Sequence, residues 1–338
     1  MKTQEIEALK ALLQESKKIV IVPHKNPDGD AIGSTLALTH YLTSLHHQVN
    51  IISPNDYPDF LKWIPGQENI INYDTDKELG EQLIAAADLI FTLDFNHLGR
   101  CGALETPLRN AEATFVMIDH HQQPDDYAFF TYSDVTMSST CQMVYHFIEM
   151  MGDENNITPE IATCIYVGIM TDTGSFRFRS TTSTTHRVIA SLIDHGADNT
   201  AIHEKIYDTN TYSRLQLQGV ALKNLKVLPE YRTAYITITQ EELDKHNFRK
   251  GDTEGFVNLG LSLHNIVFAL IFIENKSEGI IKISLRSKGD FSVNEFSRAH
   301  FEGGGHHNAA GGKSNLSIEE TVAKLISILP DYKNALNS

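Results

Sequence analysis

The feature that most constrains the fold of this chain is the alternation of apolar, strand-like segments with helical ones in its first half. Leu and Ile recur at helical spacing near the N-terminus, and KKIVIVP (17–23) then predicts a short buried strand. The strand-like segments VNIIS (49–53), DLIFTLD (88–94) and TFVMID (114–119) follow, with helical stretches between them. This alternation is typical of α/β domains that are built on a parallel sheet.

A parallel sheet of this kind brings the carboxyl ends of its strands to one edge. The four predicted strands end near Pro23, Ser53, Asp94 and Asp119. Open α/β sheets bind their ligands at that edge. We therefore expect the functional residues just beyond these strand ends.

The length of 338 residues favours two domains. We expect an α/β protein in which 1–190 form the parallel-sheet domain, 191–228 form a helical linker and 229–338 form a smaller mixed α/β domain. The smaller domain contains the strand-like segments TAYITIT, IVFALIFIE and GIIKISLR, then a Gly-rich loop and a C-terminal helix.

Composition excludes several classes of protein. Asp and Glu number 43 against 28 Lys and Arg, a net charge of −15, which disfavours duplex DNA as a partner. Three cysteines without CxxC spacing support neither a disulfide framework nor a zinc ribbon. The sequence contains no segment of signal-peptide type and no apolar run of about 18 residues. We therefore expect a cytoplasmic protein without a membrane partner.

The turn HKNPDGD directly follows the first buried strand and contains His24, Asp28 and Asp30. Pro27 and Gly29 allow a sharp backbone path that can bring the three side chains together around a metal ion. A histidine with carboxylates suits manganese, iron, cobalt or zinc better than calcium. The alternative is a solvated turn in which the aspartates cap the following helix.

Three further features lie at the ends of predicted elements. Asp94 follows one strand, Asp119-His120-His121 ends another, and Asp172 lies where a helix gives way to a loop. Each has an alternative interpretation as a cap or turn residue, and adjacent histidines are weak evidence in a chain with 16 of them. Their shared placement at strand and helix ends favours a common site.

Together, HKNPDGD, Asp94, Asp119-His120-His121 and Asp172 resemble the motifs of the DHH phosphoesterase superfamily. The later segments SLRSKG (284–289) and GGGHHNAAGG (303–312) resemble the DHH-associated substrate domain. Within the superfamily, the chain is most similar to the group of bifunctional oligoribonucleases and pAp phosphatases. The resemblance extends over nearly the whole chain.

The resemblance implies two divalent metal ions, with Mn²⁺ as the expected metal. The implied ligands are His24, Asp28 and Asp94 for one ion, and Asp30, Asp94, His120 and Asp172 for the other. Two such ions activate a shared water as hydroxide for in-line attack at phosphorus. Asp94, as the bridging ligand, and His121 are the expected catalytic residues, with His121 bonding the phosphoryl oxygen or protonating the leaving group.

The resemblance also implies a substrate-binding site in the C-terminal domain, facing the metals across an interdomain cleft. Its expected residues are Arg286, Ser287, Gly303, Gly304, Gly305 and His306. Glycines allow the backbone to approach a phosphate closely, and an arginine can bind one with two parallel hydrogen bonds. The alternative for the glycine run is a flexible loop with a helix beginning at Asn308.

The function implied is hydrolysis of short oligoribonucleotides such as pApA to 5′-mononucleotides, and of 3′-phosphoadenosine 5′-phosphate (pAp) to AMP. The same motifs also serve phosphodiesterases of cyclic dinucleotides such as c-di-AMP, which is the alternative activity. A nucleotide-binding module without catalysis is the third hypothesis. Short RNA and small nucleotides are the expected partners, and a homodimer is compatible with the sequence.

Overall fold

The computed structural model describes residues 1 and 3–337 and divides the chain into two compact units, Met1–Thr209 and the part from Asn210 onward. Within the described residues, no helix has the length and apolar character needed to cross a bilayer. The boundary between the units lies inside the segment expected to be a helical linker. Helices occupy both sides of it, with α8 (Asn199–Tyr207) in the first unit and α9 (Tyr212–Asn224) in the second.

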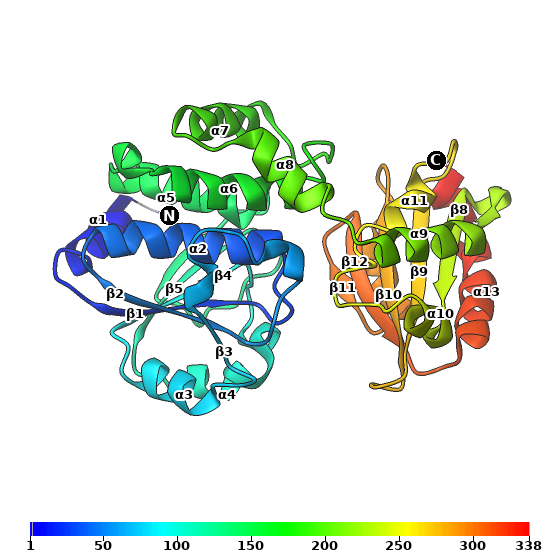
Figure 1. Cartoon of the computed structure of the whole chain (residues 1–338), viewed down its shortest axis with the longest axis horizontal. Helices are drawn as coiled ribbons and strands as arrows, with labels where there is room; N and C mark the ends of the chain where they lie inside the picture. The colour runs from blue at the N-terminus through cyan, green and yellow to red at the C-terminus, as the bar shows by residue number, and fades with distance from the viewer. Residues whose placement is uncertain (2, 338) are drawn as a thin grey trace. The chain divides into compact units, whose positions relative to one another are not determined.

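The first unit contains a six-stranded parallel sheet, which confirms the predicted α/β architecture (Figure 1). The strands, in spatial order, are β3 (Ile70–Asn72), β2 (Gln48–Ser53), β1 (Lys18–Pro23), β4 (Leu89–Leu93), β5 (Thr114–Asp119) and β6 (Phe130–Ser133). The four longer strands were expected from the sequence. β3 and β6 were not, because they are short edge strands without a long apolar run.

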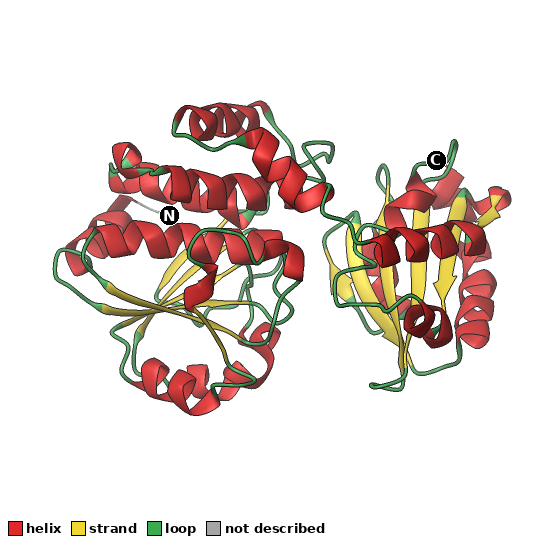
Figure 2. Ribbon diagram, in the orientation of Figure 1, coloured by secondary structure: helices red, strands yellow, loops and turns green. Residues whose placement is uncertain are grey.

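Helices cover both faces of this sheet (Figure 2). The α-helices on one face are α1 (Thr3–Leu12), α2 (Gly29–Ser44), α5 (Thr140–Met151) and α6 (Pro159–Asp172), and those on the other are α3 (Lys77–Ala85) and α4 (Glu105–Arg109). Helix α7 (Ser183–Asp194) and α8 follow α6. Short 3-10 helices lie at Asp59–Leu61, Gln67–Asn69, Leu98–Leu104 and Glu154–Asn156.

Burial on both faces explains why β1 is apolar from Ile19 onward. Ile19 and Ile21 belong to the core beneath α2, α5 and α6, whereas Val20 and Val22 belong to the core on the side of α3 and α4. Strands covered by helices on both faces have this continuous apolar pattern. The sheet is thereby held rigidly, and the loops at its carboxyl edge are fixed at their bases.

The second unit contains a mixed six-stranded sheet. Its strands, in spatial order, are β11 (Gly304–Gly305), β12 (Ala309–Ser314), β10 (Ile280–Ser287), β9 (Phe268–Asn275), β8 (Thr233–Ile238) and β7 (Lys226–Leu228), with only β8 and β9 parallel. The helices are α9, α10 (Gln240–Lys245), α11 (Val257–Leu261), α12 (Val293–His300) and α13 (Ile318–Asn337), with a 3-10 turn at Pro229–Tyr231.

Alternation along β9 divides the second unit into two apolar layers. Phe268 and Leu270 pack in the core with α12 and α13, whereas Ala269 and Ile271 pack in the core with α9, α10 and α11. This is the period-2 pattern of a sheet covered on both faces. The smaller mixed α/β domain expected from the sequence is therefore present.

The glycine-rich segment is neither a flexible loop nor the start of a helix. Gly304 pairs with Gly311, and β12 pairs in turn with β10 in an antiparallel ladder. The alternative with a helix beginning at Asn308 is wrong. The small residues that follow it form β12, whose backbone groups pair with those of β10.

Candidate metal centre

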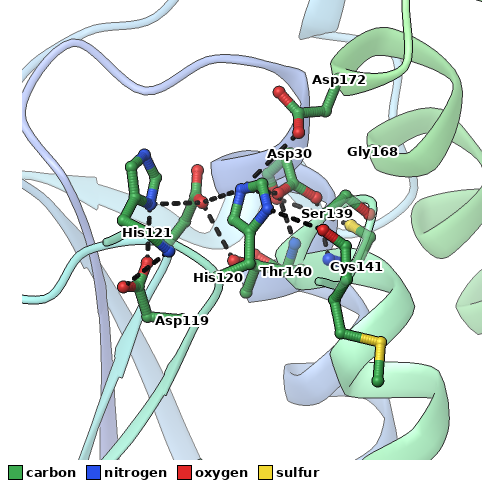
Figure 3. Close-up of polar contacts among 12 residues, drawn as sticks. Asp30, Asp119, His120, His121, Ser139, Thr140, Cys141, Gly168 and Asp172 are labelled. Atoms are coloured by element: carbon green, nitrogen blue, oxygen red, sulfur yellow. Dashed lines mark hydrogen bonds and ion pairs between the residues drawn. The ribbon is translucent and has the colours of Figure 1, made fainter. Parts of the chain in front are cut away.

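Three neighbouring strands bring the predicted residues of the first unit together. β1, β4 and β5 lie side by side in the sheet, and His24, Asp94 and Asp119 lie at their carboxyl ends. His120 and His121 continue directly from β5 (Figure 3). The edge expected from the sequence therefore carries a dense group of carboxylates and imidazoles.

Asp28 serves two roles at once. Its Oδ1 atom accepts hydrogen bonds from the backbone N–H groups of Asp30 and Ala31, at 3.0 and 3.1 Å, and so caps α2. Its Oδ2 atom lies 4.0 Å from Nε2 of His24. The capping and ligand interpretations of this residue are therefore compatible, because each uses a different oxygen.

Asp94 lies between two groups of candidate ligands. Its Oδ2 atom is 3.3 Å from Nε2 of His24, whereas its Oδ1 atom is 3.5 Å from Nε2 of His120. The Thr140 hydroxyl also donates to Oδ1, at 2.9 Å. Asp94 has a left-handed backbone conformation with φ of 64°, which Asp tolerates better than most residues. The turn directs the carboxylate between the two histidines.

The second group consists of Asp30, His120 and Asp172. Nε2 of His120 is 3.8 Å from Oδ2 of Asp30 and 3.6 Å from Oδ2 of Asp172. Asp172 is the last residue of α6, so a helix end presents it to the sheet edge. The ligand atoms of these three residues lie within 4.8 Å of one another, as do those of His24, Asp28 and Asp94.

The N-terminus of α5 holds Asp30 in place. The backbone N–H groups of Thr140 and Cys141 donate to the two carboxylate oxygens of Asp30, at 2.6 and 2.8 Å (Figure 3). Ser139 caps this helix through its side chain. The positive end of a helix stabilises a carboxylate. The roles of Thr140 and Cys141 were not predictable from the sequence, because a backbone donor leaves no signature in residue type.

Asp119 fixes the orientation of His121. Its Oδ1 atom lies 2.7 Å from Nδ1 of His121, and its Oδ2 atom accepts the backbone N–H of the same residue at 3.0 Å. Asp119 is fully buried. A carboxylate on Nδ1 favours a proton on that nitrogen and leaves Nε2 for the other partner. From the sequence, Asp119 was expected as part of a motif but without a role of its own.

The electrostatics of the site depend on its buried carboxylates. Burial and the neighbouring charges of Asp94 and Asp172 raise the pKa of Asp30 well above its ordinary value. Burial acts in the same direction on Asp94, but hydrogen bonds from His120 and His24 outweigh it and hold the pKa of Asp94 well below its ordinary value. Such a concentration of negative charge attracts cations.

His120 shows the converse effect. Burial lowers its pKa, but Asp94 and Asp172 outweigh burial and raise the pKa well above the ordinary value. His24 has its pKa raised in the same way, by Asp94 and Asp28 against burial. Both imidazoles therefore occupy positions that favour a positive charge, which a metal ion or a proton can supply.

In the second unit, Arg286 and Ser287 lie at the end of β10. Arg286 pairs with Ala269 on one side and Ala309 on the other, and its guanidinium donates to the Leu285 carbonyl at 3.0 Å. The Ser287 hydroxyl is buried and donates to the carbonyl of Phe291 at 2.7 Å. Ser287 therefore has a structural role at the end of β10, directly after Arg286.

Gly303 and Gly305 pack closely against their own unit, whereas a β-carbon on Gly304 would meet no atom nearer than 3.5 Å. A β-carbon on Gly303 would overlap the Gly311 carbonyl and the Ser297 hydroxyl. The backbone N–H of Gly305 donates to the Asn294 side chain at 3.2 Å. Packing within the unit thus accounts for Gly303.

His306 lies in the tight turn between β11 and β12. Its backbone N–H donates to the Ala309 carbonyl at 2.7 Å. Arg298 of α12 donates to the same Asn294 oxygen that receives the Gly305 N–H, at 3.0 Å. Arg298 is a cationic neighbour of the glycine strand, and no expectation from the sequence included it, because it lies between the SLRSKG and GGGHHNAAGG motifs and belongs to neither.

Comparison with known proteins identifies the family. Residues 18–169 match the model of the DHH family, N-terminal domain, and 231–333 match the DHHA1 domain. The bifunctional oligoribonuclease and PAP phosphatase NrnA of Thermus thermophilus is 31% identical over 95% of this chain and 90% of its own length.

Two further relatives are informative. The crystal structure of an exopolyphosphatase-related protein from Bacteroides fragilis is 42% identical, with a TM-score of 0.96, and the match covers 100% of this chain and 98% of that one. The cyclic-di-AMP phosphodiesterase GdpP of Bacillus subtilis is 26% identical over 96% of this chain but only 49% of its own length. This chain belongs to the DHH family, and it is an enzyme of the phosphodiesterase or phosphatase kind.

Proposed function

We propose that this protein is a metal-dependent hydrolase that releases 5′-mononucleotides from short oligoribonucleotides such as pApA and converts pAp to AMP. The observation that carries the proposal is the position of Asp94, whose two oxygens face separate groups of ligands. The relative from Thermus thermophilus, named for both activities and matched over most of both chains, supports this choice of substrates.

The residues present fit divalent cations. Both groups combine carboxylate oxygens with an imidazole nitrogen, a donor set that suits manganese and related metals. Mn²⁺ is the metal we propose. Two such cations, when bound, activate water and offset the charge of the phosphoryl oxygens. His24, Asp28 and Asp94 would hold one cation.

Asp30, Asp94, His120 and Asp172 would hold the other cation, with Asp94 shared. The helix α5 orients Asp30 and Thr140 orients Asp94, so that neither carboxylate needs to reorganise when the site is filled. A preorganised site of this kind spends little binding energy on ordering its ligands.

His121 is the proposed acid of the reaction. Asp119 accepts from its Nδ1 atom and fixes the orientation of the ring, so that Nε2 is the atom left to donate to a phosphoryl oxygen or to the leaving oxygen. Asp119 acts through His121 and is therefore a positioning residue. In the second unit, Arg286, Gly304, Gly305 and His306 are the proposed phosphate-binding groups, with Gly303 and Ser287 supporting them.

The alternative is a phosphodiesterase for cyclic dinucleotides such as c-di-AMP. The match to GdpP over 96% of this chain favours it, although this chain spans about half of that relative. A module that binds nucleotides without hydrolysing them is the remaining alternative, and the complete set of candidate ligands argues against it.

One assay separates the two activities. Purified protein with Mn²⁺ is given linear pApA and c-di-AMP at equal concentration, and the products are separated chromatographically. We expect rapid release of AMP from pApA with c-di-AMP unchanged. Opening of c-di-AMP at a comparable rate would favour the alternative, and no turnover of either, with no uptake of metal, would favour the binding module.

The wider setting of this activity is also a proposal. Short RNA and small nucleotides are the expected partners, and the cytoplasm, where the buried thiols of Cys101, Cys141 and Cys164 remain reduced, is the expected location. A homodimer and the lack of duplex DNA binding stay predictions from the sequence.

A further inference from the structure

The chain makes an unusual turn immediately after Asp172. Gly174, Ser175 and Phe176 have φ values of 56°, 59° and 64°, three successive residues in the left-handed region. That conformation is easy for glycine and costly for serine and phenylalanine, whose β-carbons crowd the following carbonyl. Backbone strain of this kind gathers at functional sites, where the surrounding structure must enforce it.

Hydrogen bonds to the end of α6 enforce the turn. The N–H of Ser175 donates to the Met170 carbonyl at 2.7 Å, and the N–H of Phe176 donates to the Thr173 hydroxyl at 3.0 Å. The N–H groups of Arg177 and Phe178 both donate to the Thr173 carbonyl, at 3.0 Å. The segment 174–178 is therefore fixed against the helix that ends in Asp172.

The turn places Phe176 against the core and leaves Phe178 exposed. Phe176 packs against the core of the first unit, with its ring centre 5.8 Å from that of Tyr166. Phe178 remains 39% exposed, and its ring lies against Gly174, where a β-carbon would be 2.5 Å from Cζ. The exposed ring can pack here only because Gly174, two residues after Asp172, has no side chain.

A cation accompanies the exposed ring. Arg177 is exposed, and its Nε atom donates to the Gly174 carbonyl at 2.7 Å. The guanidinium and the Phe178 ring are therefore both anchored on Gly174. An aromatic face beside an arginine is the combination that proteins use to hold single-stranded nucleotides, with the base stacked on the ring and the backbone near the cation.

We propose that Phe178 is the platform on which a nucleobase of the substrate stacks, and that Arg177 contacts the neighbouring phosphate. The inference rests on the proposed function, which it extends from phosphate chemistry to recognition of the base. Cations held by the aspartates and histidines of the metal groups would engage the phosphate, and the ring of Phe178, six residues along the chain from Asp172 and packed on Gly174, supplies the apolar surface that a base requires. Stacking is tolerant of base identity, since every base has a flat face.

The test compares pAp with its abasic analogue, ribose bisphosphate without adenine, as substrates of wild-type protein and of the variant Phe178→Ala in Mn²⁺. We expect the KM for pAp to rise about 5- to 100-fold, the range typical of a lost base stack, with kcat within about twofold. The KM for the abasic analogue should not change. Phe178→Tyr should retain the wild-type KM, whereas Phe178→Leu, which still covers Gly174, should behave as Phe178→Ala does.

Phe129→Ala is the matched control, because Phe129 is an exposed phenylalanine of the same unit, 76% exposed and far along the chain from Asp172. We expect it to leave both substrates unaffected. An unchanged KM for pAp in Phe178→Ala, or an equal change for pAp and its abasic analogue, would overturn the platform while leaving the proposed function intact. Wild-type protein that hydrolyses neither compound would contradict the proposed function itself, and the platform with it.

Discussion

Gly168 of α6 faces the sulfur of Cys141 on α5 so closely that no β-carbon fits between them. A β-carbon on Gly168 would also lie 2.8 Å from Oδ1 of Asp30, the atom that accepts the Cys141 N–H. The contact between α5 and α6 and the position of Asp30 therefore both require that residue 168 has no side chain.

Gly168→Ala should consequently reduce both stability and activity. We expect a loss of about 1 to 3 kcal/mol in the free energy of unfolding, as for other overpacked cores, together with weaker metal binding because Asp30 must move. Urea unfolding and metal titration measure the two effects. Gly219→Ala is the control, since Gly219 is an exposed residue of α9 with open space around it, and it should gain about 0.5 to 1 kcal/mol. Wild-type metal affinity in a stable Gly168→Ala protein would contradict the coupling.

Asp94→Asn should remove activity without unfolding the protein. Asn adopts the left-handed backbone conformation of this position as readily as Asp, and its side-chain oxygen can still accept from Thr140. The shared carboxylate charge is lost, and we expect kcat for pApA to fall at least about 100-fold. Turnover near the wild-type rate in a folded Asp94→Asn protein would exclude the two-cation arrangement. Circular dichroism and the melting temperature establish that the variant is folded.

The arrangement of the sheet edge was predictable because strand ends, carboxylates and histidines all leave a signature in the sequence. His24, Asp94 and Asp119 lie where the apolar runs stop, and the parallel sheet brings those ends together. The N–H groups of Thr140 and Cys141 were not predictable. They lie 110 and 111 residues from Asp30 along the chain, and any residue but proline carries the same donor.

The glycine run illustrates a second limit of the sequence. Glycine is equally compatible with a loop, a phosphate-binding turn and a close-packed strand, and only the tertiary contact of Gly303 with Gly311 and Ser297 distinguishes them. β3 and β6 were missed for a related reason. Each has only a few residues, and its pairing with a longer neighbour, rather than its own pattern, makes it a strand.

Asp28 allows its two roles to be measured separately. Asp28→Asn keeps an oxygen that can cap α2 but removes the charge facing His24, so we expect unchanged stability with weaker metal binding. Asp28→Ala removes both, and should in addition cost about 1 kcal/mol in the free energy of unfolding, the usual cost of a lost helix cap. Thermal unfolding of the metal-free proteins gives the first quantity, and calorimetric titration with Mn²⁺ gives the second. Equal stability of the two variants would show that the cap is dispensable.

His47 should make the protein sensitive to mild acid. Its Nδ1 atom accepts the backbone N–H of Lys17 at 3.2 Å, and its ring is buried, with Nε2 lacking a partner among the described residues. Burial, followed by the charge of Lys17, lowers the pKa of His47 below its ordinary value of 6.5. The unfolded chain therefore binds a proton more readily than the folded one, so stability falls as the pH drops below about 6.5.

His47→Asn, which retains an acceptor, should flatten the dependence of the urea midpoint on pH between about 7.5 and 5.5. His46→Asn, at an exposed neighbour with φ of 67°, should leave that dependence in place, and an identical pH profile in both variants would contradict the assignment to His47.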